Sequence, residues 1–385
     1  MIIRSLTFRF SRLRRNPIPT IKSLAKTTPF AFQFRQASQS AVKVIFSGIQ
    51  PTGVPHLGNY LGALQQWVEL QKEPSSSTRL FYCVVDLHAV TLLQNPQQLQ
   101  IWRRETLAAL LAVGLDPDRC NIFFQSSVPA HCELMWILSC TASVGYLSRM
   151  TQWKSKLSLP EQSSVQDAAA KAKLKLGLFS YPVLQAADIL LYGTTHVPVG
   201  EDQLQHLEFA RECAGNFNAV YGHVLTPPET ILSPAKRIMS LKHPMLKMSK
   251  SHADPRSRIL ISDSMENIEM KIRLAMTDSI SGVSYDPVSR PGVSNLLSIM
   301  SHLDEEERSC EELAEACKGL TLRQFKDKAS QTIDKGVSEI RDRYIHLMQS
   351  SGASALDAIA RQGAVTANKE AGATMADVRR AMGLH

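Results

Sequence analysis

The chain has 385 residues and a formal net charge of +8, with 44% hydrophobic and 20% charged residues. This composition is typical of a globular protein and argues against a disordered or fibrous one, and the length favours two domains. Residues 1–40 contain eight basic side chains and no acidic one, whereas the rest of the chain contains 35 of each sign. The body of the chain is therefore formally neutral, which argues against non-specific coating of nucleic acid through net charge.

Residues 1–40 have the composition of an organellar transit peptide. They are acid-free and rich in arginine, serine and threonine, and their first residues are amphipathic when placed on a helix. Arg9 and Arg12 interrupt the apolar core that a secretory signal would need. We expect import into the mitochondrial matrix; a plastid transit peptide has a similar composition, and a disordered basic arm that touches RNA is the remaining alternative.

The rest of the chain gives no sign of a membrane span, a disulfide framework or a structural metal. No later apolar run approaches the length of about 18 residues that crosses a bilayer. The seven cysteines form no CxxC pair and no Cys/His pattern with zinc spacing; they are Cys83, Cys120, Cys132, Cys140, Cys213, Cys310 and Cys317. A scattered, odd set of this kind fits buried thiols in a reducing compartment.

Short apolar runs alternate with longer helical patterns from residue 42 onward. The pattern predicts a strand at 42–46, a helix at 57–68, a strand at 80–85, a helix at 98–113, a strand at 122–125, helices at 130–143 and 181–192, a strand at 197–199 and a helix at 202–217. This alternation predicts an α/β fold with a Rossmann-like, doubly wound parallel sheet. The polar, alanine-rich stretch at 157–172 is a candidate mobile loop.

The strand signal ends at about residue 264, and only helical patterns follow. They lie at 265–276, 294–303, 321–348 and 354–382. We therefore predict a transit segment at 1–40, a catalytic domain at 41–263 and a helical C-terminal domain at 264–385.

The turn after the first predicted strand, residues 48–59, is the first candidate site. Gly53 and Gly58 let the backbone approach a ligand closely, and the helix that follows points its N–H groups at the same place. At the carboxyl end of a parallel sheet, this arrangement predicts an anion site. The pattern is neither a P-loop, since Val54 and Pro55 follow Gly53, nor a GxGxxG fingerprint. Taken alone, it is also compatible with a Gly/Pro-rich connector.

A lysine-rich run is the second candidate site, made of Lys247, Met248, Ser249, Lys250 and Ser251. Two lysines three residues apart, flanked by small hydroxyl groups, form a cationic loop that can stabilise charge developing on a leaving phosphate. A short Lys/Ser run by itself is equally compatible with a solvated loop.

Together, the two segments resemble the signature motifs of class I aminoacyl-tRNA synthetases. His56, Leu57, Gly58 and Asn59 are similar to the HIGH motif after the first strand, and residues 247–251 match the KMSKS loop after the last. Further stretches resemble tryptophanyl-tRNA synthetases of the bacterial and organellar type, at 46–53, 85–89, 186–192 and 197–203. Tyrosyl-tRNA synthetases share the fold but generally carry different versions of the last two stretches. The resemblance runs from about residue 42 to the C-terminus.

The resemblance implies an ATP site built from both motifs, with Mg²⁺ accompanying the nucleotide. The implied catalytic residues are His56, Asn59, Lys156, Lys247 and Lys250. The implied ATP contacts are Gln50, Pro51, Thr52, Gly58, Asn59, Gly200, Glu201, Asp202, Ile238, Lys247, Met248, Ser249, Lys250 and Ser251. No side chain acts as a nucleophile, because the carboxylate of the amino acid attacks the α-phosphate in line; positioning and charge stabilisation carry the catalysis.

The resemblance also implies a tryptophan pocket around Asp188. This residue matches the family position that accepts a hydrogen bond from the indole N–H, and its apolar neighbours favour burial over a solvent-facing helix cap. Phenylalanine would leave the buried carboxylate unpaired, at a cost on the order of 1–3 kcal/mol. Other implied pocket residues are Tyr181, His88, Gln50 and Gln203. Gln185 stands where bacterial relatives often have methionine, which alters how the pocket packs on the indole.

The remaining implications concern partners. The region 264–385 is implied to bind the anticodon of tRNA(Trp), and a helical insertion at about 130–195 to form the tryptophan pocket and the contacts of a homodimer. Candidate phosphate contacts are the basic helix faces with Lys171, Lys173, Lys175, Arg379 and Arg380. A solvated helix face is the alternative for each of them.

The sequence thus predicts an active mitochondrial member of this family, which activates tryptophan with ATP and transfers it to tRNA(Trp). A catalytically silent relative that binds tRNA or another partner is a second hypothesis, against which both intact signature loops and Asp188 argue. A third is another nucleotidyltransferase with HxGH chemistry; such enzymes are usually shorter and lack the long helical C-terminal region. ATP–pyrophosphate exchange with each amino acid separates the three.

Overall fold

The computed structural model describes residues 42–74, 77–232, 237–250 and 252–384. The predicted transit segment at 1–40 and the predicted ATP contact Ser251 lie outside these described residues.

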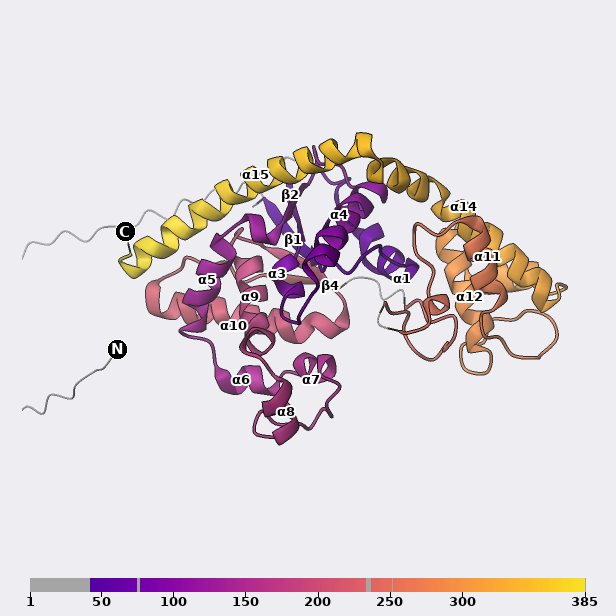
Figure 1. The fold of residues 1–385 in the computed structure, drawn as a ribbon, viewed down its shortest axis with the longest axis horizontal. Helices are drawn as coiled ribbons and strands as arrows, with labels where there is room; N and C mark the ends of the chain where they lie inside the picture. The colour runs from indigo at the N-terminus through magenta and orange to yellow at the C-terminus, as the bar shows by residue number, and fades with distance from the viewer. Residues whose placement is uncertain (1–41, 75–76, 233–236, 251, 385) are drawn as a thin grey trace, which may run out of the picture. The chain divides into compact units, whose positions relative to one another are not determined.

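A five-stranded parallel sheet with the order β3-β2-β1-β4-β5 is formed within residues 43–232 (Figure 1). The strands are β1 (Lys43–Ile49), β2 (Thr78–Val84), β3 (Asn121–Phe124), β4 (His196–Val199) and β5 (Glu229–Leu232). Strand order reverses between β1 and β4, which makes the carboxyl ends of these two strands the topological switch point where such sheets bind ligands.

The first four strands confirm the sequence prediction, and β5 is an addition to it. Strands in a parallel sheet are covered on both faces, so they read as continuous apolar runs. Strand β2 follows this rule, with six of its seven residues buried. Strand β5 has four residues, and Glu229 and Leu232 at its two ends are exposed. It therefore carries no apolar run that the sequence could reveal.

Helices connect the strands and cover the sheet. They are α1 (Leu57–Asn59), the π-helix η1 (Tyr60–Leu64), α2 (Gln65–Leu70), α3 (Asp86–Ala89), α4 (Pro96–Ala112), η2 (Gln125–Ser127), α5 (Ala130–Ser139), α6 (Val144–Arg149), α7 (Gln152–Lys156), α8 (Ala168–Lys173), α9 (Leu176–Leu190), η3 (Glu201–Gln203) and α10 (Leu204–Tyr221). The predicted helix at 57–68 is thus α1, η1 and α2 in succession. In the described part of the chain, no helix has both the length and the apolar character of a membrane span.

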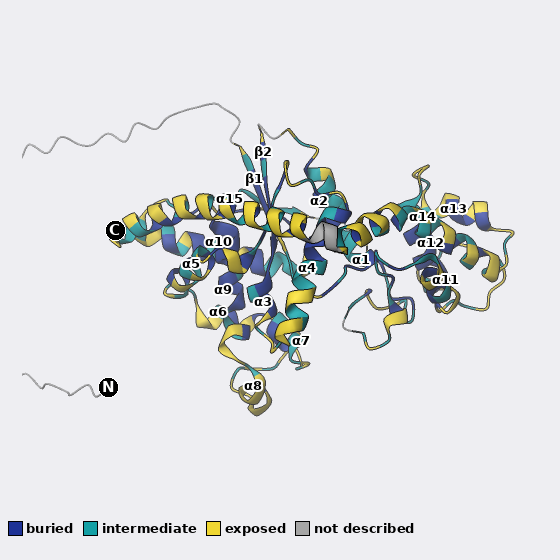
Figure 2. Cartoon of the chain, turned by 45° about the horizontal axis from the view of Figure 1, so that its top comes forward, coloured by how far each residue is buried: buried dark blue, intermediate teal, exposed yellow. Residues whose placement is uncertain are grey.

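Local sequence explains where α4 begins, and burial distinguishes α9. Asn95 caps α4 by accepting a hydrogen bond from the Gln98 N–H, and Pro96 occupies its first turn. Helix α9 begins five residues before the predicted 181 and is mostly buried (Figure 2), since ten of its fifteen residues face the core. It packs between α5 and α10, which places Asp188 inside the protein.

Four helices after residue 264 share a core with the first signature motif. They are α11 (Met265–Arg273), α12 (Pro291–Leu303), α13 (Cys310–Cys317) and α14 (Leu322–Met348). Phe325 and Ile333 of α14 belong to the same buried cluster as Leu57 of α1 and Met248 of the lysine-rich loop. The helical region therefore supports both signature segments directly.

The last helix, α15 (Ser350–Met382), leaves this helical core and packs on the sheet (Figure 1). Ala367 and Met375 join the core cluster that contains Phe123 of β3. At Gly363 the two backbones come so close that an added Cβ would lie 1.8 Å from the Ile122 carbonyl oxygen. Helix α15 thus covers β3, the strand at one edge of the sheet, so that this edge does not stay open to another chain.

Candidate active site

The predicted site residues lie at the carboxyl edge of the sheet because they follow its strands directly. Gln50 comes after β1, His88 lies on α3 just after β2, and Gly200 follows β4. In a parallel sheet the carboxyl ends of all strands point the same way, so the nucleotide and tryptophan candidates share one edge. Gln125, which follows β3, completes this edge.

His56 begins helix α1 as its N-cap and is buried. Its Nδ1 accepts a hydrogen bond from the Asn59 N–H at 3.2 Å, and the Asn59 Oδ1 accepts one from the His56 N–H at 3.2 Å. Burial, with the nearby charges of Lys250, Arg258 and Lys247, lowers the pKa of His56 to about 3. The ring is therefore neutral with its proton on Nε2, which leaves a hydrogen-bond donor suited to a phosphate oxygen.

Lys250 joins the two signature segments. Its Nζ donates to the Gly53 carbonyl at 2.6 Å and to the Thr52 Oγ1 at 3.2 Å, although these residues are nearly two hundred positions apart. Burial lowers the pKa of Lys250 to about 8, against the opposing charge of Glu105. The ammonium group thus already lies on the turn at which the sequence predicts the nucleotide.

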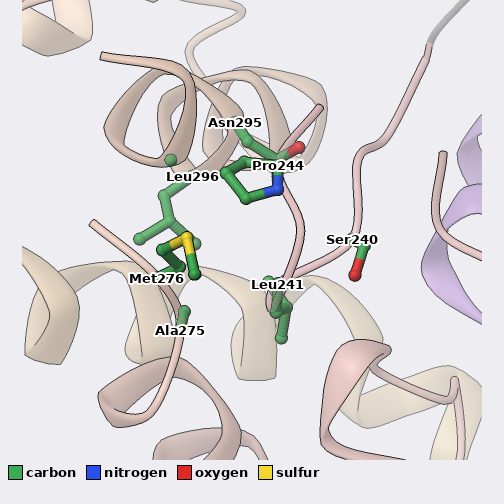
Figure 3. A pocket seen from close by; sticks show the side chains of 8 residues that line it. Ser240, Leu241, Pro244, Ala275, Met276, Asn295 and Leu296 are labelled. Atoms are coloured by element: carbon green, nitrogen blue, oxygen red, sulfur yellow. The ribbon is translucent and has the colours of Figure 1, made fainter. Parts of the chain in front are cut away.

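The base of the lysine-rich loop is fixed to the helical region. Met248 is buried and its N–H donates to the Ile238 carbonyl at 2.9 Å. Asn295 of α12 bonds both backbone groups of Met239, at 2.9 and 3.0 Å. Figure 3 shows Asn295 and Leu296 beside the segment that carries Ser240, Leu241 and Pro244. Lys247 itself is exposed, so the loop has a rigid base and a free cationic side chain.

The turn after β4 connects the predicted ribose contacts to their neighbours. Glu201 pairs with Arg237 at 2.7 Å, just before Ile238 and the lysine-rich loop. The Gln152 Nε2 donates to the Asp202 carbonyl at 3.2 Å. The Gln185 Nε2 donates to the Gln203 Oε1 at 3.3 Å. Gln185, the departure from the bacterial pattern, therefore orients another predicted pocket residue.

Asp188 confirms the prediction of a buried carboxylate, with 1% of its surface exposed. Its Oδ2 lies 2.7 Å from the His88 Nε2, and its Oδ1 accepts from the Gln125 Nε2 at 2.7 Å and lies 2.7 Å from the His131 Nδ1. Burial alone would raise the pKa of Asp188, but His131 and His88 reverse that effect and hold the pKa below its usual range. The predicted tryptophan pocket thus contains a charged hydrogen-bond acceptor.

Tyr181 lies beside this acceptor and under a lysine. Its ring meets the His88 ring edge-on at 6.1 Å, and its hydroxyl lies 2.7 Å from the His206 Nε2. The Nζ of Lys156 stands 4.5 Å from the Tyr181 ring centre, a cation–π geometry. Burial lowers the pKa of both Lys156 and His206, the latter to about 4. Lys156, predicted to face the phosphates, thus stands over the predicted tryptophan pocket.

Sequence reasoning missed three side chains of this site: Gln125, His131 and His206. Gln125 could have been found, because it directly follows a predicted strand at the ligand edge. His131 and His206 lie within helices α5 and α10, where a single histidine gives no signal of its partner. Among the described residues, no group of three or more His, Cys, Asp or Glu side chains is arranged to hold a metal ion.

Comparison with known proteins assigns the family. The model for class I tRNA synthetases (W and Y) matches residues 39–338. The mitochondrial tryptophan–tRNA ligase of Schizosaccharomyces pombe is 44% identical over 88% of this chain and 95% of the relative, and that of Saccharomyces cerevisiae is 41% identical over 91% and 94%. The tryptophanyl-tRNA synthetase of Campylobacter jejuni, solved with ADP and tryptophan, has a TM-score of 0.73 and 31% identity over 89% of this chain and 100% of its own. The chain therefore belongs to the class I aminoacyl-tRNA synthetases, in the tryptophanyl branch of that family.

Proposed function

We propose that this chain is a tryptophan–tRNA ligase, which converts L-tryptophan and ATP to tryptophanyl-adenylate and pyrophosphate and then transfers the tryptophanyl group to the 3′ end of tRNA(Trp). The observation that carries this proposal is the buried, ionised Asp188 at the sheet edge where Lys250 meets the glycine-rich turn. One end of the site offers an acceptor for an indole N–H, and the other offers donors for phosphates. The ADP and tryptophan of the Campylobacter jejuni relative support the same ligand pair here.

ATP binds along the turn after β1, under the lysine-rich loop. The His56 Nε2–H donates to a phosphate oxygen, whereas the Leu57 N–H already bonds the Ile259 carbonyl and the Asn59 N–H the His56 Nδ1. Gly58, where an added Cβ would lie 3.0 Å from the His56 Cε1, contacts the nucleotide through its backbone. The remaining contacts come from Gln50, Pro51, Thr52, Asn59, Gly200, Glu201, Asp202, Ile238, Met248 and Ser249. Mg²⁺ bound together with the nucleotide would neutralise further charge on its phosphates.

The tryptophan carboxylate attacks the α-phosphate in line, and pyrophosphate leaves. Lys247 and Lys250 stabilise the charge that grows on the leaving group, since both belong to a loop whose base is fixed at Met239. Lys250 exchanges its bonds to Thr52 and Gly53 for bonds to the phosphates. Lys156 reaches the same phosphates from above Tyr181.

Side-chain selection depends on Asp188. Tryptophan satisfies the carboxylate through its indole N–H, and phenylalanine leaves one acceptor position without a partner in a buried site. Tyr181, His88 and Gln203 shape the pocket around the ring, and Gln50 lies near the amino-acid carboxylate.

Membership of this family also supports a proposal for the partners of the chain, which are tRNA(Trp) and a second copy of the chain. The helical region 264–385 reads the anticodon of tRNA(Trp), and basic helix faces bind the phosphates. A homodimer forms through the insertion at about 130–195, where Trp136 and Val144 are 73% and 67% exposed. The two yeast relatives are mitochondrial by name, and with the acid-free residues 1–40 they favour action in the mitochondrial matrix over a plastid.

The test is ATP–pyrophosphate exchange with each of the twenty amino acids in turn, followed by aminoacylation of a tRNA(Trp) transcript. We expect exchange with tryptophan. Exchange with tyrosine but not tryptophan would show that the pocket has been misassigned, and no exchange with any amino acid would favour a catalytically silent relative.

A further inference from the structure

The three donors around Asp188 are divided unevenly between its two oxygens. Oδ1 is approached by the Gln125 Nε2 and by the His131 Nδ1, each at 2.7 Å, whereas Oδ2 has only the His88 Nε2 at 2.7 Å. A carboxylate has about four lone-pair positions, two on each oxygen. Both positions on Oδ1 therefore face a nearby donor, although the His131 N–H is poorly aligned with Oδ1, and the remaining acceptor position of this buried group lies on Oδ2.

We propose that His131 is a positioning residue for amino-acid selection, which occupies Oδ1 of Asp188 and so directs the open lone pair of Oδ2 to the substrate. This inference rests on the proposed function and deepens it. His131 acts through Asp188 and makes no contact with the substrate. It lies on α5, 57 residues away from Asp188 on α9, and the two helices pack against each other.

The surroundings of His131 fix which of its nitrogens carries the proton. Its side chain is fully buried, and its Nε2 lies 2.8 Å from the Tyr192 hydroxyl. The Asp188 carboxylate that faces Nδ1 can only accept, so the proton belongs on Nδ1 and the Tyr192 hydroxyl donates to Nε2. Nδ1 then holds the proton of the imidazole and faces the Asp188 carboxylate.

Tyr192 is itself immobilised by aromatic neighbours. Its ring stacks on Phe81 at 4.8 Å and on Phe46 at 5.7 Å, both of which are strand residues. The order Tyr192, His131, Asp188 is thus a rigid series of contacts that begins in the sheet core and ends at the pocket. The His131 N–H is bent away from the line to Oδ1, so the contact is short without being a well-aligned hydrogen bond. We therefore expect the His131–Asp188 contact to contribute a free energy at the lower end of the range for hydrogen bonds to charged groups.

Three substitutions of His131 distinguish the contribution of its Nδ1 from that of its Nε2. Asparagine places its amide N–H near the position of Nδ1, glutamine places its amide near Nε2, and leucine supplies neither. In ATP–pyrophosphate exchange, H131Q and H131L should raise the KM for tryptophan roughly tenfold and leave the KM for ATP unchanged. H131N should stay within roughly threefold of the wild-type KM for tryptophan. Discrimination against phenylalanine should fall in H131Q and H131L alone.

A matched control tests α5 without touching the carboxylate. Glu133 lies two residues after His131 and pairs with Arg379 of α15, its Oε1 accepting from the Arg379 Nε at 2.7 Å. E133Q loosens this attachment of the helix and should leave the KM for tryptophan at the wild-type value. KM is measured on the folded, active fraction, so partial unfolding of a variant does not imitate the predicted result.

Two results overturn the inference while the proposed function stands. One is a wild-type KM for tryptophan in H131Q and H131L. The other is an equal rise in H131N, H131Q and H131L that E133Q reproduces, because this would mean that only the packing of α5 matters. A wild-type enzyme that does not exchange with tryptophan overturns the proposed function instead, and the inference with it.

Discussion

Replacement of Gly363 by alanine tests the packing of α15 on the sheet. The added Cβ would lie 1.8 Å from the Ile122 carbonyl oxygen, whereas ordinary contact begins at 3.4 Å. The obstacle is backbone on both sides, so no side-chain rotation relieves it. Helix α15 must therefore move away from β3 by about 1.6 Å, the difference between these two distances.

The expected loss in the free energy of unfolding comes from the overpacking itself and from the hydrogen bonds that the movement of α15 strains. Overpacking of this kind destabilises by about 1–3 kcal/mol. The shift also strains two hydrogen bonds, from Asn121 to the Gly363 carbonyl at 3.1 Å and from Asn368 to the Ser127 carbonyl at 2.8 Å. Each is worth about 0.5–1.5 kcal/mol. Alanine recovers about 0.5–1 kcal/mol because it is the better helix former. We expect G363A to lower the free energy of unfolding by about 2–4 kcal/mol.

Gly372 in the same helix provides the matched control, since no atom lies within 4 Å of the position that a Cβ would take there. G372A should raise the free energy of unfolding by about 0.5–1 kcal/mol. The assay is urea unfolding followed by circular dichroism, with the two midpoints compared at an unchanged m value. The same glycine-to-alanine substitution should thus lower the free energy of unfolding at position 363 and raise it at position 372. A G363A protein as stable as the wild type would refute the close approach of α15 to β3.

Two further predictions concern the site. D188A should raise the KM for tryptophan on the order of tenfold to a hundredfold and abolish the preference for tryptophan over phenylalanine. ATP binding, measured by calorimetry, should persist in this variant. Unchanged discrimination between the two amino acids would mean that another residue binds the indole N–H. The pKa of Lys250 near 8 predicts that kcat/KM for ATP falls as pH rises through about 8, because the free enzyme then loses this positive charge. K250R stays protonated across this range, so the fall should disappear; coincident pH profiles of wild type and K250R would assign it to another group.

The sequence predicted most strongly those features that local pattern determines. Strands β1 to β4 were recognisable because both faces of the sheet are covered, and β5 was not because its ends are exposed. The apolar neighbours of Asp188 correctly indicated its burial, since nearly every residue around it on α9 faces the core. These predictions needed no knowledge of how distant segments meet.

The missed features depend on distant packing. His131 meets Asp188 only because α5 and α9 pack together, and Lys250 reaches Gly53 only because its loop folds over the turn. The helical pattern at 354–382 predicted a helix but not its return to the sheet. A signal was present in the small residues Gly363, Ala367 and Ala371, which recur every fourth position and allow close approach to β3.

The position of α15 has a consequence for how the chain is made. Strand β3 ends at residue 124, yet the helix that covers it begins only at residue 350, and the bond from Asn121 to Gly363 spans 242 residues. Until then a nascent chain carries every signature motif and an uncovered strand edge, which is the kind of surface that aggregates. Loss of α15 alone would therefore leave every signature motif in place beside an unprotected strand edge. The sheet edge at β3 is thus protected only after residues 350–382 have been made and have folded back onto it.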